Sequence, residues 1–265
     1  MATAATRSEY GYFLNELSTC SDERLLILDY DGTLAPFTAH RHRAFPYDGV
    51  RDLLNTIQNQ CKTRLVIVTG RSAAEIPMLL PLDRSPEIWG VYGIQRIRAD
   101  GREEVAFVPP AGVQAIADAD SWLEELGLGD RIDYKVAAVA VHLRGLPHRA
   151  ADQVRIECYS KLAQIACAAN LTLTEFDGGL ELRLKSCDKA HAVNAILAGV
   201  DESAPVAFLG DDSTDESAFQ AINHRGLSVL VRSTYRSTTA RVWLRPPQEL
   251  LNFLADWAAA CGGTH

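Results

Sequence analysis

Short, continuous runs of apolar residues alternate with amphipathic segments along much of the chain. Residues 25–28, 65–68 and 206–209 are uninterrupted apolar runs, typical of strands buried on both faces of a sheet. Residues 49–60 carry apolar side chains with the period of a helix. Strands that alternate with helices in this way predict an α/β fold with a doubly wound, Rossmann-like core and a mostly parallel sheet.

Weaker signals extend this pattern toward both ends of the chain. Apolar spacing, the turn pair Asp100-Gly101 and the helix-opening pair Pro246-Pro247 mark these additional elements. They are a helix around residues 13–17, a strand over 88–92, a hairpin with arms at 94–98 and 104–108, strands at 227–231 and 242–244, and a last helix after Pro247.

The order of elements changes between Pro110 and Leu184. A helix closed by Gly127 is followed by a strand over residues 135–144, a long helix over 154–169, and two strands around a glycine-rich turn. A further strand near Ile132 is also compatible with the pattern. These elements predict a small α+β unit with an antiparallel sheet. We therefore assign residues 1–109 and 185–265 to the core, and residues 110–184 to an inserted cap that acts as a lid.

Polar side chains follow the predicted core strands where each strand ends. Carboxyl ends of parallel strands meet at one edge of a sheet, where ligands bind, so we expect these side chains to lie together. They are Asp29 and Asp31 after the first strand, Thr69 after the second, Lys189 at the start of the helix after the cap, and Asp211, Asp212 and Asp215 after the strand at 206–209.

This set of side chains suits phosphoryl transfer through a carboxylate nucleophile, which we assign to Asp29. Both reactants are anionic, and two unit charges about 4 Å apart interact by about 4 kcal/mol at a protein-like dielectric. A single lysine cannot balance several carboxylates and a phosphate dianion. The sequence therefore predicts a bound Mg²⁺ ion, which is held in proteins by a few carboxylates and a phosphate group.

Composition excludes some other classes of function. The chain has 265 residues, 47% of them hydrophobic, and its net charge of −8 argues against a nucleic-acid-binding protein. The six cysteines show no C-x-x-C spacing, which argues against a zinc site and favours a reduced, cytoplasmic protein. Residues 1–16 lack a signal-peptide pattern, and no apolar run is long enough to span a bilayer.

The four motifs resemble those of the haloacid dehalogenase superfamily, and the inserted unit resembles its larger, C2-type cap. Within that superfamily, the chain is similar to trehalose-6-phosphate phosphatases over roughly residues 24–245. The stretches that carry this similarity are Asp-Tyr-Asp-Gly-Thr at 29–33, Val-Thr-Gly-Arg at 68–71, Asp-Lys at 188–189 and Gly-Asp-Asp-x-Thr-Asp-Glu at 210–216. The resemblance implies a magnesium-dependent hydrolase that converts trehalose 6-phosphate to trehalose and phosphate through an aspartyl phosphate.

The resemblance also implies a role for each motif residue. Asp29 is the nucleophile, and Asp31 protonates the leaving sugar oxygen and then activates water. To act first as an acid, Asp31 must hold a proton, which crowding by the other carboxylates would favour. Thr69 binds phosphoryl oxygens, and Lys189 balances charge. The implied metal site consists of Asp29, the backbone carbonyl of Asp31, and Asp211, with support from Asp212 and Asp215.

Substrate binding is expected to involve residues of both predicted domains. The residues implied are Gly70, Arg71 and Gln95 of the core and Lys135, His142, Arg144, Glu181 and Arg183 of the cap. His142 and Arg144 lie two positions apart, as do Glu181 and Arg183, so each pair would share one face of a strand. The chain departs from the family at Gln95, where the family has a carboxylate. This departure concerns the sugar rather than the four catalytic motifs.

Structural interpretations compete with several of these assignments. Thr69 is expected to be a helix N-cap in addition to its catalytic role, and Asp212 and Asp215 could cap the helix that follows them. The basic cluster at residues 41–43 and the segment 232–245 are interpreted as exposed, and the cysteines as buried apolar side chains.

Other functions also fit the same motifs. They are a phosphatase for glucosylglycerol phosphate or for glucosyl- or mannosyl-3-phosphoglycerate, a non-catalytic sugar-phosphate sensor, and a phosphomutase. The expected partner is a small sugar phosphate, with a glycosyl-phosphate synthase as a pathway partner. A monomer is favoured.

Overall fold

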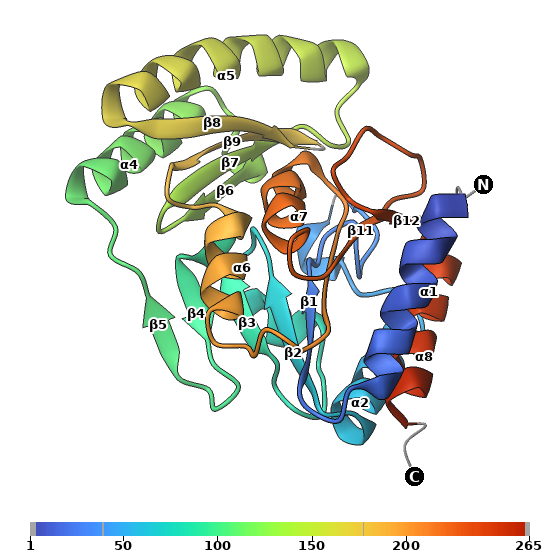
Figure 1. Ribbon diagram of the computed structural model, residues 1–265. Coiled ribbons are helices and arrows are strands. Elements are labelled where there is room, and N and C mark those ends of the chain that lie inside the picture. The colour runs from blue at the N-terminus through green and yellow to red at the C-terminus, as the bar shows by residue number, and fades with distance from the viewer. Residues whose placement is uncertain (1–3, 39, 177, 263–265) are drawn as a thin grey trace. The chain divides into compact units, whose positions relative to one another are not determined.

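The computed structural model describes residues 4–38, 40–176 and 178–262 (Figure 1). The described residues form an eight-stranded sheet and a four-stranded sheet. The chain divides into two compact units, one made of Met1–Glu104 and Lys189–His265 and the other of Val105–Asp188. The second unit is therefore an insertion in the first.

The sheet of the first unit is parallel over most of its width, as predicted. Leu26 of the first strand lies between Ala207 and Leu65 of its two parallel neighbours. Only β4, next to β3, is shown to run antiparallel to its neighbour. In spatial order the strands are β12 (Val242–Leu244), β11 (Leu227–Val231), β10 (Val206–Gly210), β1 (Arg24–Leu28), β2 (Thr63–Val68), β3 (Glu87–Gly90), β4 (Gln95–Ile97) and β5 (Glu103–Val105).

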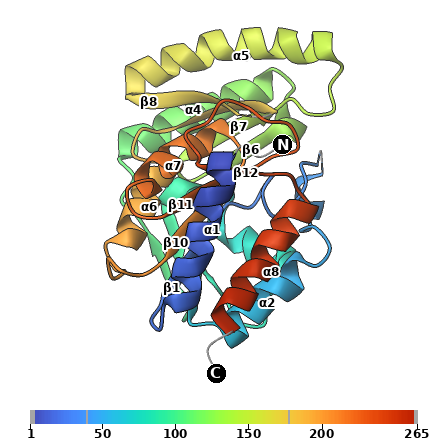
Figure 2. The ribbon, with the colours of Figure 1, turned by 45° about the vertical axis from the view of Figure 1, so that its right-hand side comes forward.

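Helices cover both faces of this sheet because alternate strand residues point to opposite sides. Leu26 and Leu28 belong to the core beneath α1, α2 and α8, whereas Leu25 and Ile27 belong to the core beneath α6 and α7 (Figure 2). Each fully buried side chain of this kind contributes about 1.5–3 kcal/mol. The helices are α1 (Ala4–Thr19), α2 (Val50–Gln60), α3 (Ile76–Leu79), α6 (Lys189–Leu197), α7 (Glu216–Ile222) and α8 (Gln248–Gly262).

The second unit is the predicted α+β structure with an antiparallel sheet. Its strands lie in the order β6 (Ile132–Lys135), β7 (Ala138–His142), β9 (Gly179–Leu184) and β8 (Leu171–Phe176), and its helices are α4 (Pro110–Glu125) and α5 (His148–Ala169). Both helices pack against this sheet. Because side chains alternate along each strand, the sheet has an apolar face, with Val139, Val141, Leu180 and Leu182, and a polar face.

Two predicted strands end elsewhere than expected. The strand expected over residues 135–144 is divided between β6 and β7, because the chain reverses at residues 136–137, and Arg144 lies in the turn after β7. Apolar residues continue through this reversal, so hydrophobic pattern alone did not reveal it. The strand expected at 88–92 ends at Gly90, because Val91 and Tyr92 adopt positive φ angles of 47° and 53°.

Within the described residues, no helix combines the length and the apolar character needed to cross a lipid bilayer.

Candidate active site

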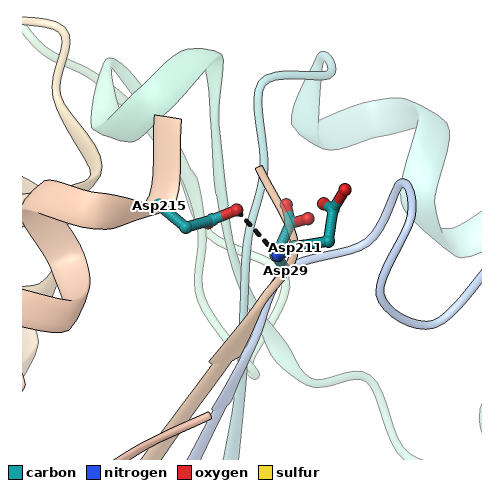
Figure 3. Close-up of side chains that lie close together, drawn as sticks. All are labelled: Asp29, Asp211 and Asp215. Carbon is teal, nitrogen blue, oxygen red and sulfur yellow. Dashed lines mark hydrogen bonds between the residues drawn. The ribbon is translucent and has the colours of Figure 1, made fainter. Parts of the chain in front are cut away.

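Two neighbouring strands bring Asp29 and Asp211 to the same edge of the sheet. Leu28 and Leu209 are paired in parallel register, and the Asp29 N–H donates to the carbonyl of Leu209 at 2.9 Å. Carboxylate oxygens of Asp29, Asp211 and Asp215 all lie within 4.8 Å of one another (Figure 3). All three side chains are buried. The predicted convergence of acidic residues from separate segments is therefore present.

Lys189 supplies a buried positive charge within this cluster. Its ammonium donates to Asp29 and to Asp215, each at 2.7 Å. Burial alone lowers the pKa of Lys189, but the charges of Asp215 and Asp29 outweigh burial and raise it above the usual value. Lys189 is thus a permanent cation between two of the carboxylates. The Asp29 carboxylate also accepts a hydrogen bond from the Thr33 hydroxyl at 3.3 Å, a contact that the sequence did not reveal.

A single cation does not neutralise the cluster. Burial raises the pKa of Asp29 to about 7, the charges of Asp215 and Asp31 add to this rise, and Lys189 opposes it. Burial, and then the charges of Asp29, Asp215 and Asp212, raises the pKa of Asp211 well above its usual value. The two carboxyls therefore favour either protonation or a further positive charge.

Asp211 has the strongest need for a cation. Both of its carboxylate oxygens are buried, and neither accepts a hydrogen bond from any described residue. Arg232 lies 3.6 Å from one of these oxygens. Gly32, at φ +85°, lies so close that an added Cβ would overlap this carboxylate. Two buried carboxylates that offer oxygen ligands form a suitable donor set for a hard divalent cation.

Asp215 uses both carboxylate oxygens within the protein. One accepts from Lys189, and the other accepts from the backbone N–H groups of Asp211 and Asp212, each at 3.0 Å. Gly210 lacks the Cβ that would overlap Asp215. These contacts make Asp215 the residue that holds the Asp211 loop to Lys189.

Asp212 lies outside the cluster of three carboxylates. It accepts a hydrogen bond from the Ser213 N–H at 2.6 Å and caps the 3-10 turn Ser213–Asp215. This is the capping role that the sequence left open for it. A role for Asp212 or Asp215 in holding a metal stays a prediction.

The Asp31 carboxylate is held by Arg71. The buried guanidinium of Arg71 donates twice to the Asp31 carboxylate, with both distances 2.6 Å. A third nitrogen of Arg71 donates to Glu75 at 2.9 Å and to the carbonyl of Arg41 at 3.1 Å. Bidentate contacts of this kind fix orientation as well as adding energy.

The loop after β2 carries Thr69 and Gly70. The Thr69 side chain is buried, and its hydroxyl accepts a hydrogen bond from the Arg71 N–H at 3.1 Å. The predicted N-cap at Thr69 is wrong: Ser72 is the N-cap of the 3-10 turn Ala73–Glu75, with Glu75 completing a capping box. Gly70 leaves space for Tyr92, whose hydroxyl would lie 2.6 Å from an added Cβ.

Gln95, the first residue of β4, stabilises the same loop. Its side-chain oxygen accepts hydrogen bonds from the Ser72 hydroxyl at 3.1 Å and from the Ala73 N–H at 3.0 Å. The backbone of residues 91 and 92 adds two more bonds to this loop, from Val91 N–H to Arg71 and from Tyr92 N–H to Thr69. Positive φ at such residues costs on the order of 1–3 kcal/mol each and is typical of functional sites.

Two arginines that the sequence interpretation placed at the surface contact the acidic loop. Arg236 donates to the carbonyls of Asp211 at 3.2 Å and Asp212 at 2.6 Å, and it forms an ion pair with Glu216. Arg232 and Arg236 are each only about a quarter exposed, so the expectation that all of segment 232–245 is exposed is wrong for them. The sequence feature that could have predicted these contacts is the opposite charge of the two loops, one containing arginines and the other rich in acidic residues.

The polar face of the cap sheet carries four of the five predicted cap residues, all except Arg144. Lys135 donates to Glu181 at 2.7 Å and contacts Asp133 at 3.0 Å, and both Lys135 and Glu181 are buried. Strand register places Arg183 next to Glu181 on this face. The ring of His142 packs edge-on against Phe176 with centroids 5.4 Å apart. Arg144 does not share the strand with His142 as expected, and Asp133 was not identified from the sequence.

Comparison with known proteins identifies the family. The profile described as Trehalose-phosphatase matches residues 27–247. An uncharacterized glycosyl hydrolase of Mycobacterium tuberculosis is 27% identical over 249 residues, which is 88% of this chain but 18% of that protein. The chain thus spans less than a fifth of that mycobacterial relative. A probable trehalose-phosphate phosphatase C of Arabidopsis thaliana is 28% identical over 251 residues, covering 87% of this chain and 75% of the relative.

Similarity to solved structures agrees with the fold. The C-terminal domain of trehalose-6-phosphate phosphatase from C. albicans superimposes with a TM-score of 0.83 at 20% identity, over 94% of this chain and 96% of that one. The sequence match covers all four motifs, from Asp29 to Asp215, and confirms the resemblance inferred from them. This chain therefore belongs to the trehalose-phosphatase family of phosphoric monoester hydrolases.

Proposed function

We propose that this protein hydrolyses trehalose 6-phosphate to trehalose and phosphate with the help of Mg²⁺. Family membership supports the reaction class, and the names of relatives such as the Arabidopsis protein support the substrate. The observation that carries the proposal is the buried pair Asp29 and Asp211. The Asp211 carboxylate accepts no hydrogen bond from a described residue and lies within reach of the Asp29 carboxylate.

The residues of the cluster fit a divalent cation. Asp29, Asp211 and the main-chain carbonyl of Asp31 would hold Mg²⁺, which when bound would neutralise negative charge on the carboxylates and on the substrate phosphate. Asp215 supports this site indirectly, because its hydrogen bonds hold the backbone of Asp211. Asp212 is proposed to contribute from outside the cluster.

The chemistry of the two steps is assigned to Asp29 and Asp31. A carboxylate oxygen of Asp29 attacks phosphorus, the bond from phosphorus to the sugar oxygen breaks, and Asp31 gives that oxygen a proton. Water then attacks phosphorus of the aspartyl phosphate, Asp31 accepts a proton from it, and phosphate is released with Asp29 restored. Arg71 donates two hydrogen bonds to the Asp31 carboxylate and so fixes its orientation in the state described.

The remaining core residues bind or position groups. Lys189 stabilises charge on Asp29 and on the transferred phosphoryl group, and the Thr69 hydroxyl with the Gly70 N–H binds phosphoryl oxygens. Arg71 and Gln95 were expected to contact substrate directly. Their hydrogen bonds support a positioning role instead, with Arg71 orienting Asp31 and Gln95 fixing the loop that carries Thr69.

We assign recognition of the sugar to the polar face of the cap. Lys135, Glu181, Arg183 and His142 offer donors and acceptors of the kind that bind sugar hydroxyls, and Arg144 is retained as a further candidate. The buried contact between Lys135 and Glu181 supports this role, because it holds both side chains in fixed orientations. We also propose that the protein is cytoplasmic and monomeric and receives its substrate from a glycosyl-phosphate synthase.

The test is phosphate release from a panel of sugar phosphates in the presence of Mg²⁺. The panel contains trehalose 6-phosphate, glucosylglycerol phosphate, and glucosyl- and mannosyl-3-phosphoglycerate, ranked by kcat/KM. The highest value for trehalose 6-phosphate is expected, and Asp29→Asn is the control that should release no phosphate from any ester. A higher kcat/KM for another ester would indicate that this ester, rather than trehalose 6-phosphate, is the substrate. Binding without any phosphate release would indicate a sensor, and a requirement for a bisphosphate activator would indicate a mutase.

A further inference from the structure

Two cysteines far apart in the chain meet at the amino edge of the large sheet. Cys61 follows the last residue of α2 and precedes β2, and Cys261 lies in the last turn of α8. Both views place the end of α8 beside the end of α2 (Figures 1 and 2). Cys61 precedes β2 whereas Asp29 follows the parallel strand β1, so the two residues lie at opposite edges of the sheet. Both thiols are buried. The Cys61 sulfur lies 3.9 Å from the carbonyl oxygen of Ala258, about one helical turn before Cys261, and the Cys261 sulfur lies 3.9 Å from the hydroxyl of Thr63, two residues after Cys61. The two thiols are therefore close enough to react with each other.

The surroundings of Cys261 favour its ionised form. The Thr63 hydroxyl accepts from the Trp257 indole at 3.1 Å and lies 3.9 Å from the Cys261 sulfur, so its hydrogen is available to Cys261. The hydrogen bond from Cys61 lowers the pKa of Cys261 to about 7, and Arg24 and Thr63 add to this effect against the opposing effect of burial. The same hydrogen bond, together with burial, raises the pKa of Cys61.

The hydrogen bonds of Arg24 show why its charge favours a negative group here. Its guanidinium is buried and donates only to backbone carbonyls of Leu17, Cys20 and Asp22. No described carboxylate forms an ion pair with it. A buried cation without an anionic partner is costly, and a thiolate at Cys261 would reduce that cost.

We propose that Cys61 and Cys261 form a redox-sensitive dithiol that hydroperoxides oxidise to a disulfide linking the end of α2 to the end of α8. The Cys261 thiolate attacks one oxygen of the hydroperoxide, the O–O bond breaks, and the products are a sulfenic acid on Cys261 and hydroxide or an alkoxide. The sulfur of Cys61 then attacks the Cys261 sulfur, and the Cys61 proton leaves with the sulfenic hydroxyl as water. The two electrons lost by the thiols are those gained by the hydroperoxide.

The disulfide would close a loop that contains β2, the whole second unit and α8. Cross-linking across so long a stretch of chain restricts the unfolded state and stabilises the folded one. We expect the oxidised protein to melt on the order of 10 °C higher than the reduced protein. Because the pair lies at the opposite edge from Asp29, we expect little change in phosphate release.

The experiment treats the reduced, full-length protein with graded hydrogen peroxide, blocks the remaining thiols and maps cross-linked peptides by mass spectrometry. A cross-link between Cys61 and Cys261 should form at lower peroxide than any modification of Cys158 or Cys187, two other buried cysteines. Cys158 and Cys187 serve as internal controls, because peroxide would oxidise these buried thiols if the protein unfolded during the treatment. Their oxidation at the same dose, without the Cys61–Cys261 cross-link, would overturn the proposal.

Single variants assign the order of attack. In Cys61→Ser, a sulfenic acid should accumulate on Cys261 and be trapped by dimedone, whereas Cys261→Ser should give no adduct on Cys61. Equal trapping on either thiol would overturn the assignment of Cys261 as the attacking group. Arg24→Gln should slow trapping about fivefold or more at pH 7, and Arg24→Lys should retain the rate. The cross-link in the unaltered protein remains decisive if an Arg24 variant fails to fold.

Discussion

The ammonium of Lys189 lies 2.7 Å from a carboxylate oxygen of Asp29, and both groups are buried. The same ammonium contacts Asp215 at an equal distance. This relationship joins the residue proposed as nucleophile to the loop that carries Asp211. It also leaves two buried carboxylates sharing a single ammonium, an imbalance that a further positive charge at the site would reduce.

Replacing Lys189 by methionine should therefore affect both activity and stability. Without the ammonium, Asp29 and Asp215 lose their buried partner, and phosphate release should fall by about a thousandfold or more. The free energy of unfolding should fall by about 3–5 kcal/mol, the usual effect of breaking a buried pair. Lys185→Met is the matched control, because Lys185 is exposed and its ammonium, within the described part of the chain, hydrogen-bonds only to Asn170. Activity close to the unaltered value in Lys189→Met would contradict the proposed mechanism.

Asp31→Asn and Asp211→Asn should separate chemistry from metal binding. Asp211→Asn removes a charged group that we propose holds Mg²⁺, so Mg²⁺ should no longer raise the melting temperature and phosphate release should stop. Asp31→Asn keeps the main-chain carbonyl, so the Mg²⁺-dependent rise should persist while phosphate release stops. Thermal melts with Mg²⁺ or EDTA, paired with phosphate assays, measure both effects. Loss of the Mg²⁺ response in Asp31→Asn alone would show that its side chain is needed to hold the ion.

Gly32→Ala should disturb the metal site through one added carbon. The new Cβ would overlap the Asp211 carboxylate, and the positive φ adds about 1–2 kcal/mol of strain. Gly101→Ala is the matched control, with φ +83° but no heavy atom within 4 Å of the new Cβ. We expect Gly101→Ala to lose about 1 kcal/mol of stability and no activity, whereas Gly32→Ala loses activity and the Mg²⁺ response. Equal activity in the two variants would mean that the site tolerates the displacement of Asp211.

Glu87 should make stability sensitive to acid. Burial acts to raise its pKa, but hydrogen bonds and charge from Arg64, with Trp89 and Arg96, outweigh burial and lower the pKa. Because the pKa of Glu87 is lower in the folded state than in the unfolded state, its ionised carboxylate stabilises the fold. This stabilisation is fully present above the unfolded-state pKa of about 4.3 and is lost as the pH falls through the folded-state pKa. Glu87→Gln should cost about 1–3 kcal/mol at pH 7, and this difference should shrink below pH 4. Urea unfolding at several pH values tests this, and a constant difference between the proteins would contradict it.

Glu181→Gln should affect the sugar rather than the phosphate. Its carboxylate holds Lys135 on the polar face of the cap sheet. We expect KM for trehalose 6-phosphate to rise at least about tenfold, whereas hydrolysis of p-nitrophenyl phosphate, which has no sugar, should change little. Glu175→Gln in neighbouring β8 is the control, because its side chain is more than half exposed. A parallel loss with both substrates would argue against a role in sugar recognition.

The strands and the convergence of acidic residues were predictable because they depend on local patterns. Continuous apolar runs such as residues 25–28 indicate strands buried on both faces of a sheet, and the parallel pairing of β1 with β10 then brings Asp29 and Asp211 to the same edge. The reversal between Lys135 and Ala138 was not predictable in this way, because apolar residues continue through it. The hydrophobic pattern predicts which residues are buried but does not predict where the chain reverses direction.

Pairings of charged side chains were the least predictable part of the site. Arg71 was expected to bind substrate, and its bidentate contact with Asp31 depends on two loops meeting in space. Arg232 and Arg236 were expected to be exposed, because arginine in a polar loop is usually solvated. Their contacts with Asp211 and Asp212 arise because β10 and β11 are neighbours in the sheet. Such contacts follow from tertiary structure and have no periodic signal.

The chain re-enters the first unit at Lys189, immediately after Asp188 closes the second. If the second unit were exchanged with that of a relative, the junction before Lys189 would have to keep its length. Even one added residue there would displace the buried ammonium of Lys189 from Asp29. The outward connection near Glu104 and Val105 has no such constraint from a catalytic side chain. Evolutionary changes in the length of the second unit would then be accommodated at the connection near Glu104 and Val105, and not at the connection before Lys189.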